Sequence, residues 1–264
     1  MSTDASSTDA SSTDASGADA ALAEDDLLPH PRTLVAAAHG TASIPGQETI
    51  AALIDEIQKL RPDLPIRLCF LDVLAPALGD VLASEPDAVV VPMLLCTGYH
   101  VLQDIPAIAR FYPDVSVTPH LGPHRALSQA LADRLSELEL ADGSALNTDS
   151  ASAKDGTKVR AIALIAGGSS VAAATEDLAA AAVDLAELTG HEVYPLTIGD
   201  ALPDQLAELQ VSAVATYLLA EGYFFHRLKT IVGPHAPVSP VIGAHPEVAK
   251  LILQRYDDAL SATL

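Results

Sequence analysis

Residues 34–41 read Leu34-Val35-Ala36-Ala37-Ala38-His39-Gly40-Thr41, an apolar run of strand length that ends in a histidine and a glycine. From Thr33 onward, short apolar runs alternate with longer amphipathic stretches, which is typical of βα units and a parallel sheet. In such sheets, ligands bind beyond the carboxyl ends of the strands. The pattern therefore predicts an α/β fold in which His39 lies at the floor of a site.

The first half of the chain is predicted to hold four strands and four helices. The strands are expected over 34–38, 66–71, 88–95 and 115–118, and the helices over 46–60, 76–83, 98–111 and 123–138.

The second half repeats the first. Residues 162–169 align with the opening stretch and place Gly167 opposite His39, while residues 216–224 match residues 92–100 and place Phe224 opposite His100. The repeat predicts two similar lobes, each with a mainly parallel four-stranded sheet flanked by helices, and a cleft between them. Because only the first copy keeps both histidines, we expect the chemistry on the N-terminal lobe.

Composition limits the possible functions. The 264 residues carry a formal net charge of −21, which disfavours nucleic acid and anionic membranes as partners. The only cysteines, Cys69 and Cys96, lie in separate apolar runs, so we expect reduced thiols. No basic leader followed by an apolar segment and no membrane-length apolar run occurs in the sequence, and a cytoplasmic protein is expected.

Two segments have compositions unlike the rest. Residues 1–30 contain a repeated Ser-Thr-Asp-Ala-Ser unit and seven acidic residues, which predicts a disordered acidic tail. Residues 140–158 are rich in Ser, Asp and Gly and are predicted to be a linker. The lobes are accordingly expected over 31–139 and 159–264.

Two histidines at the ends of parallel strands suggest a shared metal site. His39 and His100 would converge on one edge of the sheet, and Asp72, which ends another strand, could complete a set of two imidazoles and one carboxylate. Asp72 could equally cap the helix that begins near Pro76. Asp104 has two interpretations as well: it could orient the His100 ring, or cap a helix that starts at Pro106, and the cap is slightly favoured.

These motifs together resemble the sirohydrochlorin chelatase family in its two-lobed long form. The matching segments are Ala38-His39-Gly40-Thr41, Cys69-Phe70-Leu71-Asp72 with Pro76, and the stretch from Val91 to Pro106 that contains Gly98-Tyr99-His100 and Asp104-Ile105-Pro106. Three motifs in order are a specific signal. The resemblance runs from about Thr33 to the C-terminus.

The resemblance implies two chelatase-like lobes that insert Co²⁺ or Fe²⁺ into sirohydrochlorin without ATP and without a permanently bound cofactor. His39 and His100 then correspond to the catalytic, metal-binding histidines. Asp72 stands where the family usually has Glu, one methylene longer. The choice between cobalt and iron, and hence between cobalamin and siroheme, stays open.

The proposed substrate, sirohydrochlorin, carries eight carboxylates, whereas the chain itself is acidic. Local positive charge would have to oppose the overall negative field, and the candidates for it are Arg110, His124, Arg125, Arg227 and Lys229. The other residues predicted to bind the substrate are Thr41, Gly98, Tyr99 and Asp104.

A histidine phosphatase needs an Arg directly before its strand-end His, and Ala38 occupies that place. Phosphate-loop and dinucleotide-binding glycine motifs are missing from the sequence. A noncatalytic carrier of metal or tetrapyrrole remains the main alternative to an enzyme.

Overall fold

The computed structural model describes residues 31–138 and 161–262. We refer to these ranges as the first and second lobes. The described residues from Arg32 onward belong to one compact unit. The predicted tail, the predicted linker and the predicted lobe boundaries at 139 and 159 lie outside the described residues. In the described part of the chain, no helix is long and apolar enough to cross a membrane.

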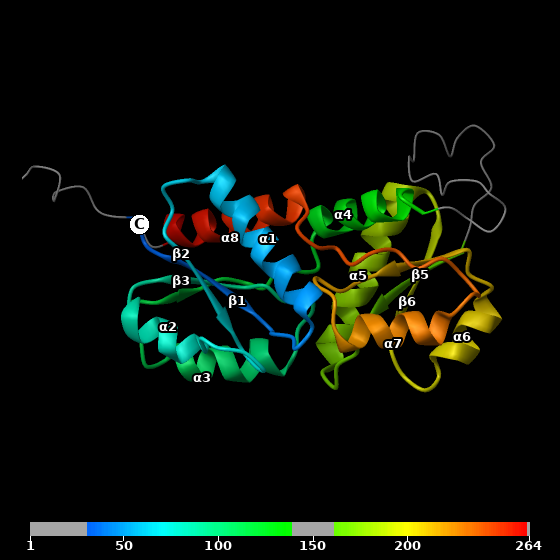
Figure 1. Ribbon diagram of the computed structural model, residues 1–264, viewed down its shortest axis with the longest axis horizontal. Helices are drawn as coiled ribbons and strands as arrows, with labels where there is room; N and C mark the ends of the chain where they lie inside the picture. Colours follow the sequence, from blue (N-terminus) through cyan, green and yellow to red (C-terminus); the bar gives the residue numbers. More distant parts are fainter. Residues whose placement is uncertain (1–30, 139–160, 263–264) are drawn as a thin grey trace, which may run out of the picture. The chain divides into compact units, whose positions relative to one another are not determined.

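The first lobe alternates strands and helices in the predicted order (Figure 1). Its elements are β1 (Leu34–Ala38), α1 (Ile44–Leu60), β2 (Ile66–Phe70), α2 (Leu78–Ser84), β3 (Val89–Pro92), η2 (His100–Asp104), α3 (Ile105–Ala109), β4 (Ser116–Val117) and α4 (Arg125–Ser136).

One predicted helix is in fact two elements. Residues 98–111 were expected to form a single helix, but His100–Asp104 is a π-helical turn, η2, in which the Ile105 N–H donates to the His100 carbonyl. Pro106 follows directly and has no N–H with which to continue a helical ladder. The dihedral angles of Asp104 and Ile105 are both helical, so α3 continues directly from the π-helical turn at Ile105.

The second lobe repeats the first with fewer elements. It holds β5 (Ala161–Ala166), α5 (Ala172–Thr189), β6 (Glu192–Thr197), α6 (Leu202–Leu209), β7 (Ala213–Thr216), α7 (Tyr223–Val232) and α8 (Pro246–Ser261).

Both sheets are parallel and share one strand order. The first runs β2-β1-β3-β4 and the second β6-β5-β7. Val214 of β7 also forms a single parallel bridge with Val238, on the side where β4 would stand in the first lobe. The prediction of two parallel sheets is confirmed, but a four-stranded second sheet is wrong, because its fourth strand is reduced to that bridge.

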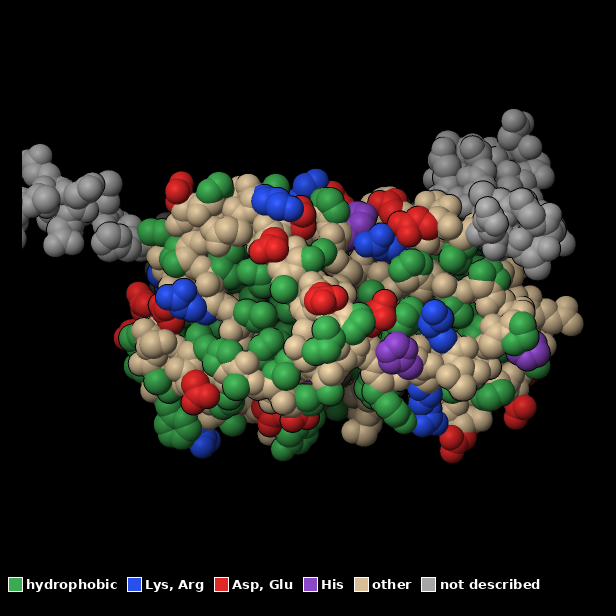
Figure 2. Space-filling model, viewed as in Figure 1, with side chains coloured by type: hydrophobic (Ala, Val, Ile, Leu, Met, Phe, Trp, Pro, Cys, Tyr) green, Lys and Arg blue, Asp and Glu red, His purple; other side chains and the backbone are tan. Residues whose placement is uncertain are grey.

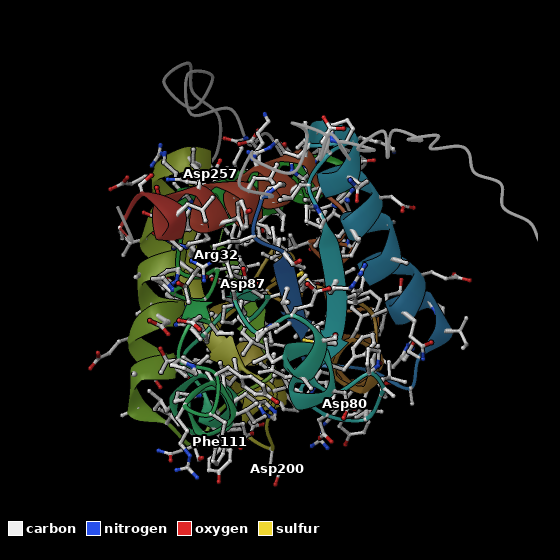
Figure 3. The ribbon with its side chains drawn as sticks, turned by 90° about the vertical axis from the view of Figure 1, so that its left-hand side faces the viewer. Arg32, Asp80, Asp87, Phe111, Asp200 and Asp257 are labelled. Carbon is white, nitrogen blue, oxygen red and sulfur yellow. The ribbon has the colours of Figure 1, made fainter. Side chains whose placement is uncertain are left out.

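The last helix of each lobe packs against the other lobe. The C-terminal helix α8 packs against α1 and β3 of the first lobe, while α4 packs against α5 and β7 of the second. Figure 3, seen from the side of the first lobe, shows α8 lying over the first sheet with α1 beside it. Tyr256 of α8 is fully buried, and its hydroxyl donates to the Arg32 carbonyl at 2.6 Å.

This exchange gives the lobes a common core. Alternate residues of β1 and β5, such as Leu34 and Leu164, face one shared apolar cluster with Tyr256. The other faces of the two sheets are covered separately, with Leu82 of α2 in one cluster and Leu228 of α7 in another. The lobes therefore cannot separate without exposing the core.

Candidate functional site

A cavity of about 690 Å³ lies between the strand ends of the two lobes. Its walls come from the segments that follow β1, β2, β3, β5 and β7, together with the first two turns of α1 and α5 and the first turn of α7. This is the edge where ligands bind in open α/β sheets. Among the described residues that line the cavity, Glu221 is the only Asp, Glu, Lys or Arg.

His39 and His100 meet at this cavity. His39 follows β1 and is exposed, while His100 begins η2 and is partly buried. Their imidazole centroids lie 4.7 Å apart with the rings at 87°. Both side chains line the cavity, which brings together the two histidines that the sequence singled out.

Hydrogen bonds fix which nitrogen of each ring is available. His100 Nδ1 lies 2.6 Å from Asp104 Oδ2, and His39 Nδ1 lies 3.2 Å from the Gly40 carbonyl oxygen. A carbonyl or carboxylate oxygen accepts, so neutral rings in this arrangement carry their proton on Nδ1. The Nε2 lone pairs bond to no described residue and can bind a metal or a proton.

Asp104 orients His100 and does not cap a helix. The residue at the start of α3 has helical dihedral angles, and its side chain makes no capping hydrogen bond. The favoured interpretation as a helix cap is therefore wrong. The π-helical turn continues the chain from His100 through Asp104, and the carboxylate is used on the imidazole instead.

Asp72 does not join the histidines. Its carboxylate accepts from the N–H of Val73 at 2.8 Å, and it does not line the cavity. Its main-chain N–H donates to the His39 carbonyl, and Gly40 packs so closely that a Cβ there would lie 2.1 Å from the Asp72 carbonyl oxygen. In the described residues, no group of three His, Cys, Asp or Glu side chains is placed to hold a metal. The expected third ligand is not brought to the site.

The alternative role of Asp72, capping α2, is not seen either. The N–H of Ala77, at the start of α2, donates instead to Asp80 Oδ2 at 3.3 Å.

Three of the residues predicted for substrate binding line the cavity: Thr41, Gly98 and Tyr99. The Tyr99 side chain is 66% exposed, so its ring is available to a ligand.

The Arg and Lys side chains predicted to bind the substrate do not line the cavity, so the prediction that they lie in the site is wrong. Arg110 stacks over Phe111, Arg125 pairs with Glu187 at 3.4 Å, and Lys229 lies over the Phe225 ring. None of these three, nor Arg227, lines the cavity. In Figure 2, Lys and Arg side chains are scattered over the visible face without a continuous basic patch.

His124 is a structural residue. Its Nδ1 accepts from the N–H of Ala126 and caps α4, and His245 caps α8 in the same way through Glu247. The repeated Gly-x-His segments near 122 and 243 therefore start the two exchanged helices. Burial lowers the pKa of His124, followed by the nearby charge of Arg255.

The second lobe fills the equivalent position with an aromatic ring. The Phe224 ring lies 3.4 Å from where a Cβ of Gly167 would stand, so it occupies the space next to the residue that matches His39. The register of the repeat also places Leu228, fully buried, where the first lobe has Asp104. Both histidines and the orienting carboxylate are thus replaced together.

Several lining residues were not anticipated. Thr97 donates its N–H to Asp177 Oδ2 of α5 at 2.6 Å, and its hydroxyl lies 3.1 Å from His120 Nε2. Cys96 also lines the cavity, and burial raises the pKa of its thiol to about 12, so it does not supply a thiolate. Tyr223 and Phe224 could have been found from the repeat, which aligns them with Tyr99 and His100.

Comparison with known proteins agrees with this geometry. Residues 33–138 match the CbiX family model. A sirohydrochlorin cobaltochelatase of Methanococcoides burtonii is 24% identical over 124 residues, which cover 40% of this chain and 95% of the relative.

Solved structures resemble the whole described fold. SirB from Bacillus subtilis with Fe³⁺ superposes with a TM-score of 0.67 at 21% identity, covering 88% of this chain and 96% of SirB. The sirohydrochlorin chelatase SirB of Bacillus subtilis subspecies spizizenii in complex with cobalt gives 0.67 at 23% identity, covering 87% and 95%. CbiX, described as the terminal enzyme of siroheme biosynthesis in denitrifying bacteria, gives 0.60 at 18%, covering 88% and 100%. These likenesses establish the fold of both lobes, and the first lobe, residues 33–138, is similar in sequence to the CbiX family.

Proposed function

We propose that this protein inserts Co²⁺ or Fe²⁺ into sirohydrochlorin without ATP, with the metal as a substrate and not as a resident cofactor. The observation that carries the proposal is the contact between the imidazoles of His39 and His100 in a cavity of about 690 Å³. The substrate is inferred from the similarity of residues 33–138 to the CbiX family and from the relatives named above, one a sirohydrochlorin cobaltochelatase and two solved with iron or cobalt. A cytoplasmic location stays a prediction from the sequence.

Two neutral imidazoles suit the delivery of a metal. Imidazole nitrogen is a good ligand for divalent first-row metals, and sites that act on a substrate keep coordination positions open. Because the described residues offer only His39 and His100 at this place, water or tetrapyrrole nitrogens would complete the shell. A metal held by few protein ligands can pass readily to a macrocycle with four nitrogens.

Metal insertion also releases two pyrrole protons. Once the metal has left the imidazoles, His100 Nε2 is free to accept a proton from a pyrrole N–H. The resulting imidazolium would lie beside the Asp104 carboxylate, 2.6 Å from Nδ1, which stabilises the positive charge. His39 is placed to take the second proton and pass it to water, because its side chain is exposed.

The proposal is tested with purified protein, sirohydrochlorin and either Co²⁺ or Fe²⁺ under anaerobic conditions. The absorbance change on metallation is followed against the spontaneous rate. We expect faster insertion than in buffer for at least one metal, and a loss of about 100-fold or more in kcat for His39→Ala and for His100→Ala. The exposed His235, which does not line the cavity, supplies the control His235→Ala, which should retain the wild-type rate.

Excess substrate separates an enzyme from a carrier. An enzyme forms many equivalents of product per chain, whereas a carrier stops at one. Insertion of both metals at the buffer rate, or full activity of both histidine variants, would contradict the proposal.

A further inference from the structure

We propose that the second lobe has become the platform for the tetrapyrrole ring, with Tyr223 and Phe224 stacking against the macrocycle while the first lobe delivers the metal. The inference rests on the proposed function and assigns the residues that would bind its organic substrate.

Aromatic residues are concentrated at the cavity. The chain has only six Tyr and four Phe and no Trp. Six of these ten line the cavity: Phe70, Tyr99, Tyr217, Tyr223, Phe224 and Phe225. A random distribution would not gather most of a scarce residue type around one hollow, and a flat conjugated ligand is the chemistry that such walls recognise.

Tyr223 and Phe224 present their rings where a ligand can reach them. Tyr223 and Phe224 are 68% and 44% exposed, although both belong to α7, which buries its Phe225, Leu228 and Val232. The two rings stand edge to face with centroids 5.5 Å apart. Two adjoining exposed rings on the wall of a cavity form an apolar surface that a flat ligand can cover.

Neighbouring residues hold the pair in place. Phe224 packs over Gly167, where a Cβ would lie in van der Waals contact with the ring at 3.4 Å. The Arg227 guanidinium donates to the Tyr223 hydroxyl at 3.0 Å and pairs with Asp200 at 3.5 Å. Arg227, expected from sequence to bind substrate carboxylates, is therefore a positioning residue for the Tyr223 ring.

The two lobes meet at the edge of the cavity. A Cβ on Gly222 would lie 2.8 Å from Thr41 Oγ1, and one on Gly46 would lie 2.0 Å from the Glu221 carbonyl oxygen. Tyr223 follows Gly222 directly, and Thr41 lies two residues after His39. This close contact ties the segment that leads to the aromatic pair to the segment that follows His39, and both pairs line the same cavity.

The charge of the lining supports recognition through the ring. No described residue lining the cavity is Lys or Arg, and Glu221 contributes a negative charge. The carboxylates of sirohydrochlorin would not find a cation there, and they would extend to solvent at the mouth. Binding would then depend on the apolar and aromatic contact with the macrocycle.

The experiment compares the binding of the two substrates. The dissociation constant of metal-free sirohydrochlorin is measured by its absorbance change, and that of Co²⁺ alone by calorimetry. For Tyr223→Leu and Phe224→Leu we expect sirohydrochlorin to bind about tenfold more weakly, KM to rise in parallel, and Co²⁺ affinity to stay at the wild-type value. Tyr223→Phe, which keeps the ring, should restore most of the binding.

Two controls make the result specific. Phe111→Leu removes an aromatic ring that is 70% exposed but does not line the cavity, and it should leave both affinities unchanged (Figure 3). His100→Ala should do the reverse of Tyr223→Leu, weakening Co²⁺ while sirohydrochlorin still binds. Thermal melts check that each variant is folded.

Failure of the platform and failure of the proposed function give different results. If the wild-type protein inserts metal but Tyr223→Leu and Phe224→Leu keep the wild-type dissociation constant and KM, the platform is wrong and the chelatase stands. The platform is equally overturned if these variants weaken Co²⁺ as much as sirohydrochlorin. If the wild-type protein neither binds nor metallates sirohydrochlorin, the proposed function itself fails.

Discussion

Asp104 acts on His100 from outside the cavity, and its charge is the property to test. Asp104→Asn keeps an oxygen that can accept from Nδ1, but it removes the negative charge that would stabilise the imidazolium. Loss of such a supporting carboxylate at a metal-binding histidine typically costs about 10–100-fold in affinity or activity. We expect kcat to fall by that factor while KM for sirohydrochlorin stays within about twofold, because Asp104 does not line the cavity.

The measurement is initial rate against sirohydrochlorin concentration, repeated across pH. The exposed Asp258 of α8 gives the control Asp258→Asn, which should behave as wild type. A purely structural Asp104 would instead lower the melting temperature and leave kcat per folded molecule and its pH profile unchanged.

That His39 and His100 lie together at the cavity could be predicted from the sequence for a physical reason. A buried strand does not need His39 for packing, since the repeat keeps the strand with Gly167 in that place. The prediction of Asp72 as a metal ligand was wrong, because a position at a strand end fixes the main chain but not the direction of the side chain. The Asp72 carboxylate accepts from the N–H of the next residue, Val73. The prediction that Arg and Lys side chains line the cavity was wrong, because the net charge of the whole chain does not say which side chains face one cavity.

At the scale of elements, the first turn of α1 has little space at Gly46. A Cβ there would lie 2.0 Å from the Glu221 carbonyl oxygen and 2.7 Å from the Thr41 methyl group. We expect Gly46→Ala to lower the free energy of unfolding by about 1–3 kcal/mol, the usual cost of overpacking, and to raise KM by displacing the loop that carries Tyr223.

Gly79 in α2 is the matched control. A Cβ there meets nothing closer than the Ile108 methyl at 3.8 Å, so Gly79→Ala should be neutral or stabilising by up to about 1 kcal/mol. Urea unfolding followed by circular dichroism measures both variants. Equal stability of the two would show that the contact between α1 and the loop after β7 does not constrain the fold.

Element boundaries were largely predictable, but the exchange of α4 and α8 was not. Hydrophobic periodicity shows that a helix has an apolar face, and it does not say which sheet that face covers. Because the lobes are copies, either last helix suits either sheet by pattern alone. The contacts that decide are specific ones, such as the Tyr256 hydroxyl on the Arg32 carbonyl and Arg134 on the Ile242 carbonyl.

At the scale of the whole molecule, the lobes are joined at the cavity wall by a partly buried polar cluster. Thr97 and His120 come from the first lobe, Asp177 from α5, and Arg255 from the exchanged helix α8. Burial lowers the pKa of His120, and Arg255 lowers it further, while the charge of Asp177 opposes both. The neutral imidazole is therefore the form that the assembled lobes favour.

This pKa shift predicts how stability depends on pH. Above the ordinary histidine pKa of 6.5, His120 is neutral in both the folded and the unfolded chain and contributes no pH dependence. As pH falls below 6.5, the unfolded chain binds the proton first, so the free energy of unfolding decreases until the lower folded pKa is reached. His124 adds to the effect with the same sign, because its pKa is also lowered and protonation would remove the Nδ1 acceptor that caps α4.

Urea titrations between pH 7.5 and about 5 measure the slope. His120→Gln removes the titrating group while keeping a polar side chain beside Thr97, so we expect the variant to lose less stability than wild type over this range, even if it is less stable at pH 7.5. His120→Gln with His124→Gln should flatten the dependence further. Carboxylates that titrate nearby are common to all three proteins and cancel in the comparison. If the free energy of unfolding changed equally with pH in wild type and in both variants, protonation of His120 and His124 would not affect the stability of the protein.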